Sequence, residues 1–167
     1  MRLRGRFYRS GRFWLAEIPL LDAMTQGRTR GELFDMVVDL VETLADRPGF
    51  SAQVHPGRNG EFELCASDTQ ALVGMVLRRQ RERSGLSLAD VAARLGAKSR
   101  NAYARYERGT AMPSVTKLGE LIQAVSQGGD LVLAESQAGY AEPPQVRGVG
   151  PARRKRSASP PNRLEQS

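Results

Sequence analysis

The stretch from Leu86 to Gly109 constrains the fold most, because it carries the start and stop signals of two short helices. Ser87 stands at an N-cap position, and Asp90 three residues later completes a capping box. Gly96 can adopt the positive φ that ends a helix, and Ser99 offers a second N-cap. The glycine that closes the stretch ends the second helix. The pattern therefore predicts two short helices joined by a tight turn.

The predicted second helix carries side chains that suit the edges of DNA bases. Its inward residues are expected to be Ala102, Tyr103 and Tyr106, and its outward residues Arg100, Asn101, Ala104 and Arg105. Arginine can donate two hydrogen bonds to guanine, and asparagine can bond adenine through two atoms. We therefore expect a helix-turn-helix whose second helix enters the major groove, with Arg100, Asn101 and Arg105 reading bases. An ordinary helical hairpin with a solvated polar face is the alternative.

Polar residues around these two helices are expected to contact DNA phosphates. They are Ser87, Lys98, Arg108 and Thr110. Such contacts position a protein on the duplex without reading its sequence. Because one short helix reads only a few base pairs, the pattern also predicts a homodimer or a dimer of dimers, with recognition helices about 34 Å apart.

Two further amphipathic segments flank the pair of helices. Residues 69–85 place Leu72, Met75, Val76 and Arg79 on one face, and Arg78, Arg81 and Arg83 outside. Pro113 and Ser114 begin another helix, whose apolar residues are Val115, Leu118, Leu121, Ile122 and Val125. Together the four segments predict a bundle of at least four helices.

The run from about Leu77 to Val125 resembles the Xre family of phage-repressor-like DNA-binding domains. The resemblance is most specific at the sequence Glu-Arg-Gly that ends at Gly109, followed by a loop and Pro-Ser. It matches the family's base-reading positions to the three residues expected to read bases. Two features depart from the family. The turn around Ala97 and Lys98 is one residue longer, and Leu88 replaces a glutamine that often contacts a phosphate.

The hydrophobic pattern changes in the N-terminal part of the chain. Strands are expected at residues 1–8, 13–18, 23–26, 50–55 and 61–66, the first two as a hairpin. From Thr29 to Pro48 the period is helical, with a stripe of Leu33, Val37, Leu40, Val41 and Leu44. The predicted fold class is therefore α+β: a small sheet with one helix, joined to an all-α helix-turn-helix domain.

A second resemblance covers residues 13–44. It rests on residues that precede or begin the amphipathic helix: Trp14, Glu17, Pro19, Leu21, Thr25, Gln26, Gly27 and Thr29. This run resembles the N-terminal, partial RNase H-like domain of the HicB antitoxins, which commonly precedes a DNA-binding module. Asp22 and Ala23 depart from the family, which usually has glycine and a small residue at these positions.

The HicB resemblance implies an antitoxin that binds and neutralises a HicA-like, mRNA-cleaving toxin and represses its own operon. Toxin contacts are expected at Phe13, Trp14, Leu21 and Asp22. An acidic stripe on the predicted helix would attract a basic toxin, and it consists of Glu32, Asp35, Asp39, Glu42 and Asp46. The alternative is a one-component transcriptional regulator whose N-terminal domain senses a small molecule.

The RNase H-like resemblance also suggests nuclease activity, but the acidic residues do not favour it. Two-metal cleavage requires several carboxylates that converge on two cations, whereas the helix acids spread along one stripe. His55 is the only histidine and Cys65 the only cysteine, so neither a histidine-based triad nor a cysteine metal site can form. We therefore expect no enzyme activity, no metal site and no cofactor.

The distribution of charge favours three parts. Residues 1–67 carry nine basic and nine acidic side chains, residues 68–138 ten and seven, and residues 139–167 six and two. We expect a toxin-binding domain at 1–67, a DNA-binding domain at 68–138 and a disordered basic tail at 139–167. The tail run Arg153 to Arg156 is interpreted as solvated, with non-specific phosphate attraction as the alternative. Without a membrane span or a signal peptide, the expected location is cytoplasmic.

Overall fold

A computed structural model of the chain describes residues 1–126, 132 and 134–135. In chain order its elements are β1 (Leu3–Ser10), β2 (Phe13–Ile18), the 3-10 turn η1 (Pro19–Leu21), β3 (Ala23–Gly27), α1 (Arg30–Ala45), β4 (Ala52–Pro56), β5 (Glu61–Ala66), α2 (Thr69–Arg83), α3 (Leu88–Arg94), α4 (Arg100–Glu107) and α5 (Val115–Val125). The α+β prediction is confirmed. The predicted basic tail lies outside the described residues.

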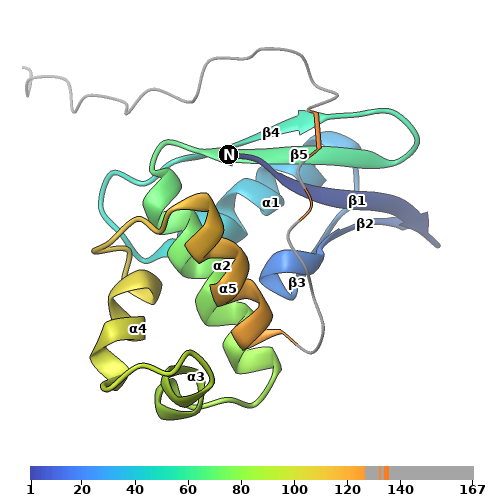
Figure 1. Cartoon of the computed structure of the whole chain (residues 1–167). Helices are drawn as coiled ribbons and strands as arrows, with labels where there is room; N and C mark the ends of the chain where they lie inside the picture. The colour runs from blue at the N-terminus through green and yellow to red at the C-terminus, as the bar shows by residue number, and fades with distance from the viewer. Residues whose placement is uncertain (127–131, 133, 136–167) are drawn as a thin grey trace, which may run out of the picture.

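The N-terminal strands form one antiparallel sheet in the order β3-β2-β1-β5-β4. Along β1, buried Leu3, Gly5 and Phe7 alternate with exposed arginines, as a strand with one covered face requires. The covering element is α1, which crosses that face (Figure 1). It turns Leu33, Val37 and Val41 toward the sheet, each with no exposed surface. The pattern predicted for this half is therefore confirmed.

The long helix α2 joins the sheet to the other helices. Its residues 71–77 are all buried, because one side faces the sheet and η1 while another faces α4 and α5 (Figure 1). One hydrophobic cluster consequently runs from β1 residues such as Leu3 and Phe7 through Leu72 and Leu77 to Val125. The two predicted domains share this core.

Polar side chains of α2 also bond the loop that follows β2. The Arg79 guanidinium donates to the carbonyls of Leu21 and Asp22 at 2.8 and 2.9 Å, and the Gln80 amide donates to the Leu20 carbonyl at 2.8 Å. These bonds satisfy backbone oxygens that the short 3-10 turn leaves without helical partners. They fix the β2–β3 connection against α2.

Two α2 arginines that were expected to point outward are partly buried. Arg78 donates to the Leu44 carbonyl at the end of α1, at 2.9 Å. Arg81 forms an ion pair with Glu107 of α4, and 15% of its side chain is exposed. The helical period places both on packed sides of α2, where ion pairs and carbonyls replace water. Within the described residues, no helix is long and apolar enough to cross a membrane.

The N-cap of α2 provides a pH-dependent contribution to stability. Asp68 Oδ1 accepts from the Ala71 N–H at 2.9 Å, and Oδ2 pairs with Arg47 Nη1 at 2.8 Å. The Ala71 bond first, and Arg47 after it, lower the pKa of Asp68 below its ordinary value of 3.8. This contribution is complete above that ordinary value and is lost as the pH falls through the lowered pKa.

We expect Asp68→Asn, which keeps a good N-cap, to make the free energy of unfolding depend less on pH in the acid range. The wild type should be more stable at pH 7, and the difference in the free energy of unfolding should shrink as the pH falls below 3.8, because the wild-type carboxyl is protonated as the pH passes through its lowered pKa. Urea unfolding in steps from pH 7 to pH 2.5 measures this difference. An equal gap between the two proteins at both ends would contradict the assignment.

Candidate nucleic-acid interface

The two short helices begin as the sequence predicts. Before α3, Ser87 Oγ accepts from the Asp90 N–H at 3.1 Å and Asp90 Oδ2 accepts from the Ser87 N–H at 2.8 Å, so the capping box is complete. A hydrogen bond from the Ser87 hydroxyl to the Asp90 carboxylate, and after it the bond from the Ser87 N–H, lower the pKa of Asp90. Before α4, Ser99 Oγ accepts from the Asn101 N–H at 3.2 Å. These local bonds fix where each helix starts.

Both helices end on glycines in the left-handed region. Gly96 has φ +63° and Gly109 has φ +59°. After α3, the Ala97 N–H reaches back to the Ala92 carbonyl at 2.9 Å, and after α4 the Thr110 N–H reaches the Arg105 carbonyl at 3.0 Å. Each is the long bond of a Schellman motif, which requires a positive φ between the helix and the bonded N–H. The predicted stops are confirmed.

The three residues expected to read bases are all exposed on α4. Because successive helical residues are about 100° apart, Arg105 lies only about 40° around the axis from Asn101. Arg100 is the first residue of α4 and lies about 100° from Asn101. Asn101 and Arg105 therefore form one outward strip, whereas Arg100 lies about 40° from the buried Ala104 and is exposed because it stands at the N-terminal tip of α4.

The inward stripe of α4 is rotated by one residue from the prediction. Ala102 is exposed, whereas Ala104 is buried with 7% exposure, so both expectations were wrong. The stripe consists of Tyr103, Ala104 and Glu107, with Tyr106 at its margin. Glu107, which the sequence pattern assigned to neither side, is an ion-paired member of the packed side. Ala102 consequently joins the outward strip.

The Arg105 guanidinium is held along the outside of α4. Its carbon lies 5.0 Å from the centre of the Tyr106 ring, and Nη2 donates to the Tyr106 hydroxyl at 3.1 Å. Stacking on a ring restricts the rotamers of a long side chain and leaves the remaining guanidinium protons free. Arg105 is therefore partly ordered before any contact with DNA.

The residues expected to contact phosphates differ in the donors that they have free. Lys98 and Arg108 are exposed, and the one side-chain hydrogen bond that Arg108 donates within the described residues runs from Nε to the Ala104 carbonyl. Ser87 is exposed, but its hydroxyl accepts from the Asp90 N–H and also bonds to the Asp90 carboxylate, so its proton is engaged within the capping box. The Thr110 hydroxyl donates its one proton to the Arg105 carbonyl at 3.0 Å. In this structure Thr110 therefore lacks the side-chain donor that was expected of it.

A nearly buried ion pair attaches α4 to α2. Arg81 Nε and Nη2 donate to the two carboxylate oxygens of Glu107 at 2.6 and 3.0 Å, and Nη1 donates to the Leu86 carbonyl at 2.9 Å. Only 7% of the Glu107 side chain is exposed. Burial first, and Glu107 next, raise the pKa of Tyr103 far above its usual range, so the phenol stays neutral. The Glu-Arg-Gly signal thus has a structural cause that the sequence analysis did not identify.

The backbones of α2 and α4 approach closely at Gly74. A Cβ at this position would lie 2.6 Å from the Glu107 carbonyl oxygen and 2.7 Å from that of Tyr106. The Gln70 amide donates to the Gly109 carbonyl at 2.6 Å one turn earlier on α2. Sequence reasoning missed Gly74 as well, although a glycine inside a helical pattern is a signal of close packing.

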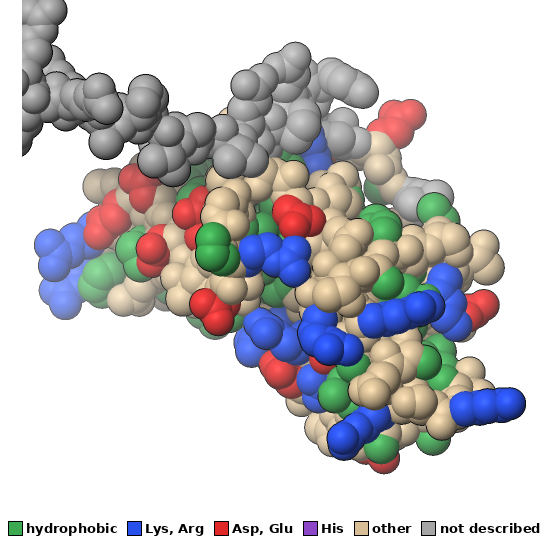
Figure 2. All heavy atoms as spheres, turned by 90° about the vertical axis from the view of Figure 1, so that its left-hand side faces the viewer, with side chains coloured by type: hydrophobic (Ala, Val, Ile, Leu, Met, Phe, Trp, Pro, Cys, Tyr) green, Lys and Arg blue, Asp and Glu red, His purple; other side chains and the backbone are tan. Residues whose placement is uncertain are grey.

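The face that carries α4 separates the two signs of charge. Figure 2 shows Lys and Arg side chains mainly over the lower part of the molecule, where the helices α3 and α4 lie in Figure 1. Asp and Glu side chains on that face lie mainly over the upper left. The lower part thus offers a basic surface to a polyanion.

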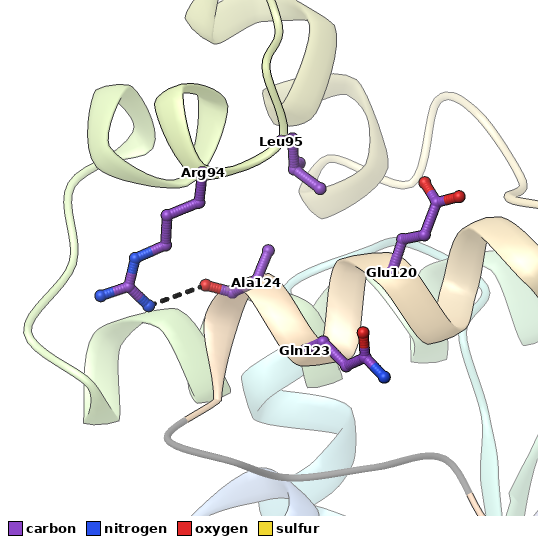
Figure 3. A pocket seen from close by; sticks show the side chains of 5 residues that line it. All are labelled: Arg94, Leu95, Glu120, Gln123 and Ala124. Carbon is purple, nitrogen blue, oxygen red and sulfur yellow. Dashed lines mark hydrogen bonds between the residues drawn. The ribbon is translucent and has the colours of Figure 1, made fainter.

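A shallow pocket lies beside this surface, between α3 and α5 (Figure 3). Its volume is about 440 Å³, and its lining residues are Arg94, Leu95, Glu120, Gln123 and Ala124. Arg94 Nη1 donates to the Ala124 carbonyl at 3.0 Å, which ties α3 to the end of α5. The pocket includes none of the residues expected to read bases.

The four residues expected to contact a toxin lie in different environments. Phe13 and Trp14 are half-buried, and Trp14 packs on Phe7 with ring centroids 6.0 Å apart. Leu21 has no exposed surface, so the structure corrects this expectation: the side chain belongs to the core. Asp22 is exposed, and its carboxylate lies 3.8 Å from Arg83 Nε. The strand edge and the loop thus do not present the four side chains together.

Comparison with protein families decides the nature of the C-terminal half. Residues 77–125 match the helix-turn-helix family. The match extends from the middle of α2 to the end of α5 and includes both capped helices, so the predicted helix-turn-helix is confirmed and DNA binding is implied. No curated protein matches the chain. The helix-turn-helix unit supports a DNA-binding transcriptional regulator.

Proposed function

We propose that this chain is a HicB-like antitoxin that represses its own operon through α4 and neutralises a HicA-like, mRNA-cleaving toxin through its partial RNase H-like N-terminal half. The observation that carries the proposal is the exposed strip of Asn101 and Arg105 on a capped helix, joined to a sheet whose outer helix is acidic. The protein acts by binding in the cytoplasm and needs no cofactor.

The DNA-binding half of the proposal rests on chemistry and shape. Asn101 offers the amide that pairs with adenine, and Arg105 offers the fork that pairs with guanine. Arg100 projects from the tip of α4, where recognition helices first meet base edges. Lys98 and Arg108 supply donors for phosphates, and Ser87 stays a candidate at the start of α3. A homodimer with two such helices would read a two-fold symmetric operator.

The toxin-binding half rests on charge. Glu32, Asp35 and Asp39 are exposed on α1, and Asp46 is exposed directly after it, while Glu42 is turned inward and accepts from the Ala52 N–H at 2.9 Å. Within the described part of the chain, Asp35 and Asp39 form no ion pair. Unpaired surface carboxylates attract a basic protein and accelerate its association. Exposed Asp22 and half-buried Phe13 and Trp14 stay as secondary candidates.

Base reading and phosphate contact can be separated by two substitutions. Arg105→Ala should weaken operator binding by about 1 to 3 kcal/mol and relax selectivity at one base pair. Lys98→Ala should weaken binding to all sequences alike and lower the slope of log K against log salt by about one. Titrations of operator and scrambled DNA at several salt concentrations measure both effects. Unchanged operator affinity in Arg105→Ala would remove that residue from base reading.

Co-expression tests the toxin-binding half. The full chain should restore growth to cells that express a HicA-like toxin, and the two proteins should co-purify. Reversing the charge of Asp35 and Asp39 with lysine should weaken that complex and leave operator binding intact, since neither residue lies in the helix-turn-helix unit. A loss of both activities would point to misfolding instead.

A one-component regulator is the second candidate, and the pocket beside α5 is the observation that favours it. In that case a small molecule in the pocket would change operator affinity, and no toxin would co-purify. Substituting Gln123, which lines the pocket, should then alter the ligand response without changing affinity in its absence.

A further inference from the structure

Arg47 connects the N-terminal half to the far end of the recognition helix. It follows α1 in the turn that leads to β4, and its guanidinium extends to two other helices. Nη1 donates to Asp68 Oδ2, at the start of α2, at 2.8 Å. Nη2 donates to the Arg108 carbonyl, at the end of α4, at 2.9 Å. One side chain thus joins three helix ends.

The Arg108 carbonyl is a group that needs such a partner. Arg108 is the C-cap residue of α4, and the last carbonyls of a helix have no intrahelical N–H to accept from. A guanidinium there satisfies the oxygen and complements the negative end of the helix dipole. Arg47 Nη2 also lies 3.2 Å from where a Cβ on Gly109 would be, so the side chain is packed closely against the turn.

The opposite anchor of Arg47 is equally fixed. Asp68 is the N-cap of α2 and accepts from the Ala71 N–H through its other oxygen. The planar guanidinium therefore spans a defined distance between one helix start and one helix end. Neither anchor belongs to the outward strip of α4.

We propose that Arg47 is a positioning residue for operator reading, through which the N-terminal half sets the angle of α4 on DNA. The proposal rests on the DNA-binding function proposed above. Bidentate contacts from Asn101 and Arg105 tolerate only small errors in helix placement, whereas long, flexible phosphate-binding side chains tolerate larger ones. Loss of the Arg47 bonds to Asp68 and to the Arg108 carbonyl, here called the clamp, should therefore reduce specific binding more than non-specific binding.

The test is Arg47→Met in the full chain, which keeps the aliphatic stem and removes both bonds. Operator affinity should fall about 10-fold, the size of one misplaced base contact, while affinity for scrambled DNA and the salt slope stay at wild-type values. Asp68→Asn should give a smaller loss of the same kind, and the double variant should lose less than the sum of the single variants.

Arg78→Met is the matched control. Arg78 also joins α2 to the end of α1, through the Leu44 carbonyl at 2.9 Å, but among the described residues it forms no hydrogen bond or ion pair with α4. It should lower the melting temperature about as much as Arg47→Met and leave the ratio of operator to scrambled affinity unchanged. An equal fall of that ratio in both variants would overturn the proposal.

Two further outcomes would also overturn it. If Arg47→Met lowers the salt slope by about one and weakens both DNAs equally, Arg47 contacts phosphate directly. If the variant binds operator like the wild type well below its melting temperature, the clamp serves stability alone. A wild-type chain that prefers no DNA sequence would instead refute the proposed function itself.

Discussion

Replacing Glu107 by glutamine is expected to lower the free energy of unfolding by about 3 kcal/mol, the lower end for breaking a buried ion pair. The substitution keeps the side-chain volume and removes the carboxylate that accepts two guanidinium bonds at 2.6 and 3.0 Å. Arg81 then keeps its charge with 15% of its side chain exposed. Denaturant unfolding at pH 7 measures the loss.

Glu120→Gln is the matched control, because Glu120 pairs with Lys117 at 2.7 Å on the exposed side of α5. Exposed pairs contribute at most about 1 kcal/mol, so this variant should be nearly neutral. Replacing Arg81 by methionine and Glu107 by leucine together should recover most of the lost stability, since both charges are gone. A Glu107→Gln loss no larger than that of Glu120→Gln would refute the role given to the ion pair.

Gly74→Ala is expected to destabilise the protein by about 2 kcal/mol, although alanine favours helices over glycine by about 1 kcal/mol. The new methyl group would meet two carbonyl oxygens of α4 at 2.6 and 2.7 Å, and backbone cannot move aside as a flexible side chain can. The helices would have to separate. Thermal unfolding should show the loss, and operator affinity should fall with it because α4 moves.

Gly119→Ala provides the contrast for Gly74. Gly119 lies inside α5, and a Cβ there would meet no atom of the described residues within 4 Å. This variant should therefore gain up to about 1 kcal/mol from helix propensity alone and bind operator normally. If both variants are stabilised, the close approach of α2 and α4 does not constrain the fold.

Local signals in the sequence accounted for most of the fold. The N-caps Ser87 and Ser99 and the stops at Gly96 and Gly109 act through bonds within a few residues, so they could be predicted without knowledge of tertiary contacts. The same holds for the β1–β2 hairpin. The order of the strands in the sheet depends on contacts distant in sequence, and the pattern of hydrophobic residues did not contain it.

The candidate site was predicted less completely, for a physical reason. Glu107 and Arg81 are charged residues at packed positions, and a hydrophobic pattern assigns such residues to the surface. Arg81 was accordingly expected on the outside. Without Glu107 the inward stripe of α4 was placed one residue off, which exchanged Ala102 with Ala104. Leu21 was misplaced because its burial is caused by α2, a helix that lies far along the chain from this loop.

The position of α2 has a consequence for anyone who wishes to retarget this protein. The family match begins at Leu77, yet the helix that contains Leu77 starts at Thr69 and has its first half in the sheet's core. A chimeric protein joined at the family boundary would divide a continuous helix and leave the hydrophobic core incomplete on both sides of the junction. A change of DNA specificity would therefore have to keep α2 whole, together with the α4 residues that contact Gly74 and Arg81. Only the exposed surface of α4 could be varied.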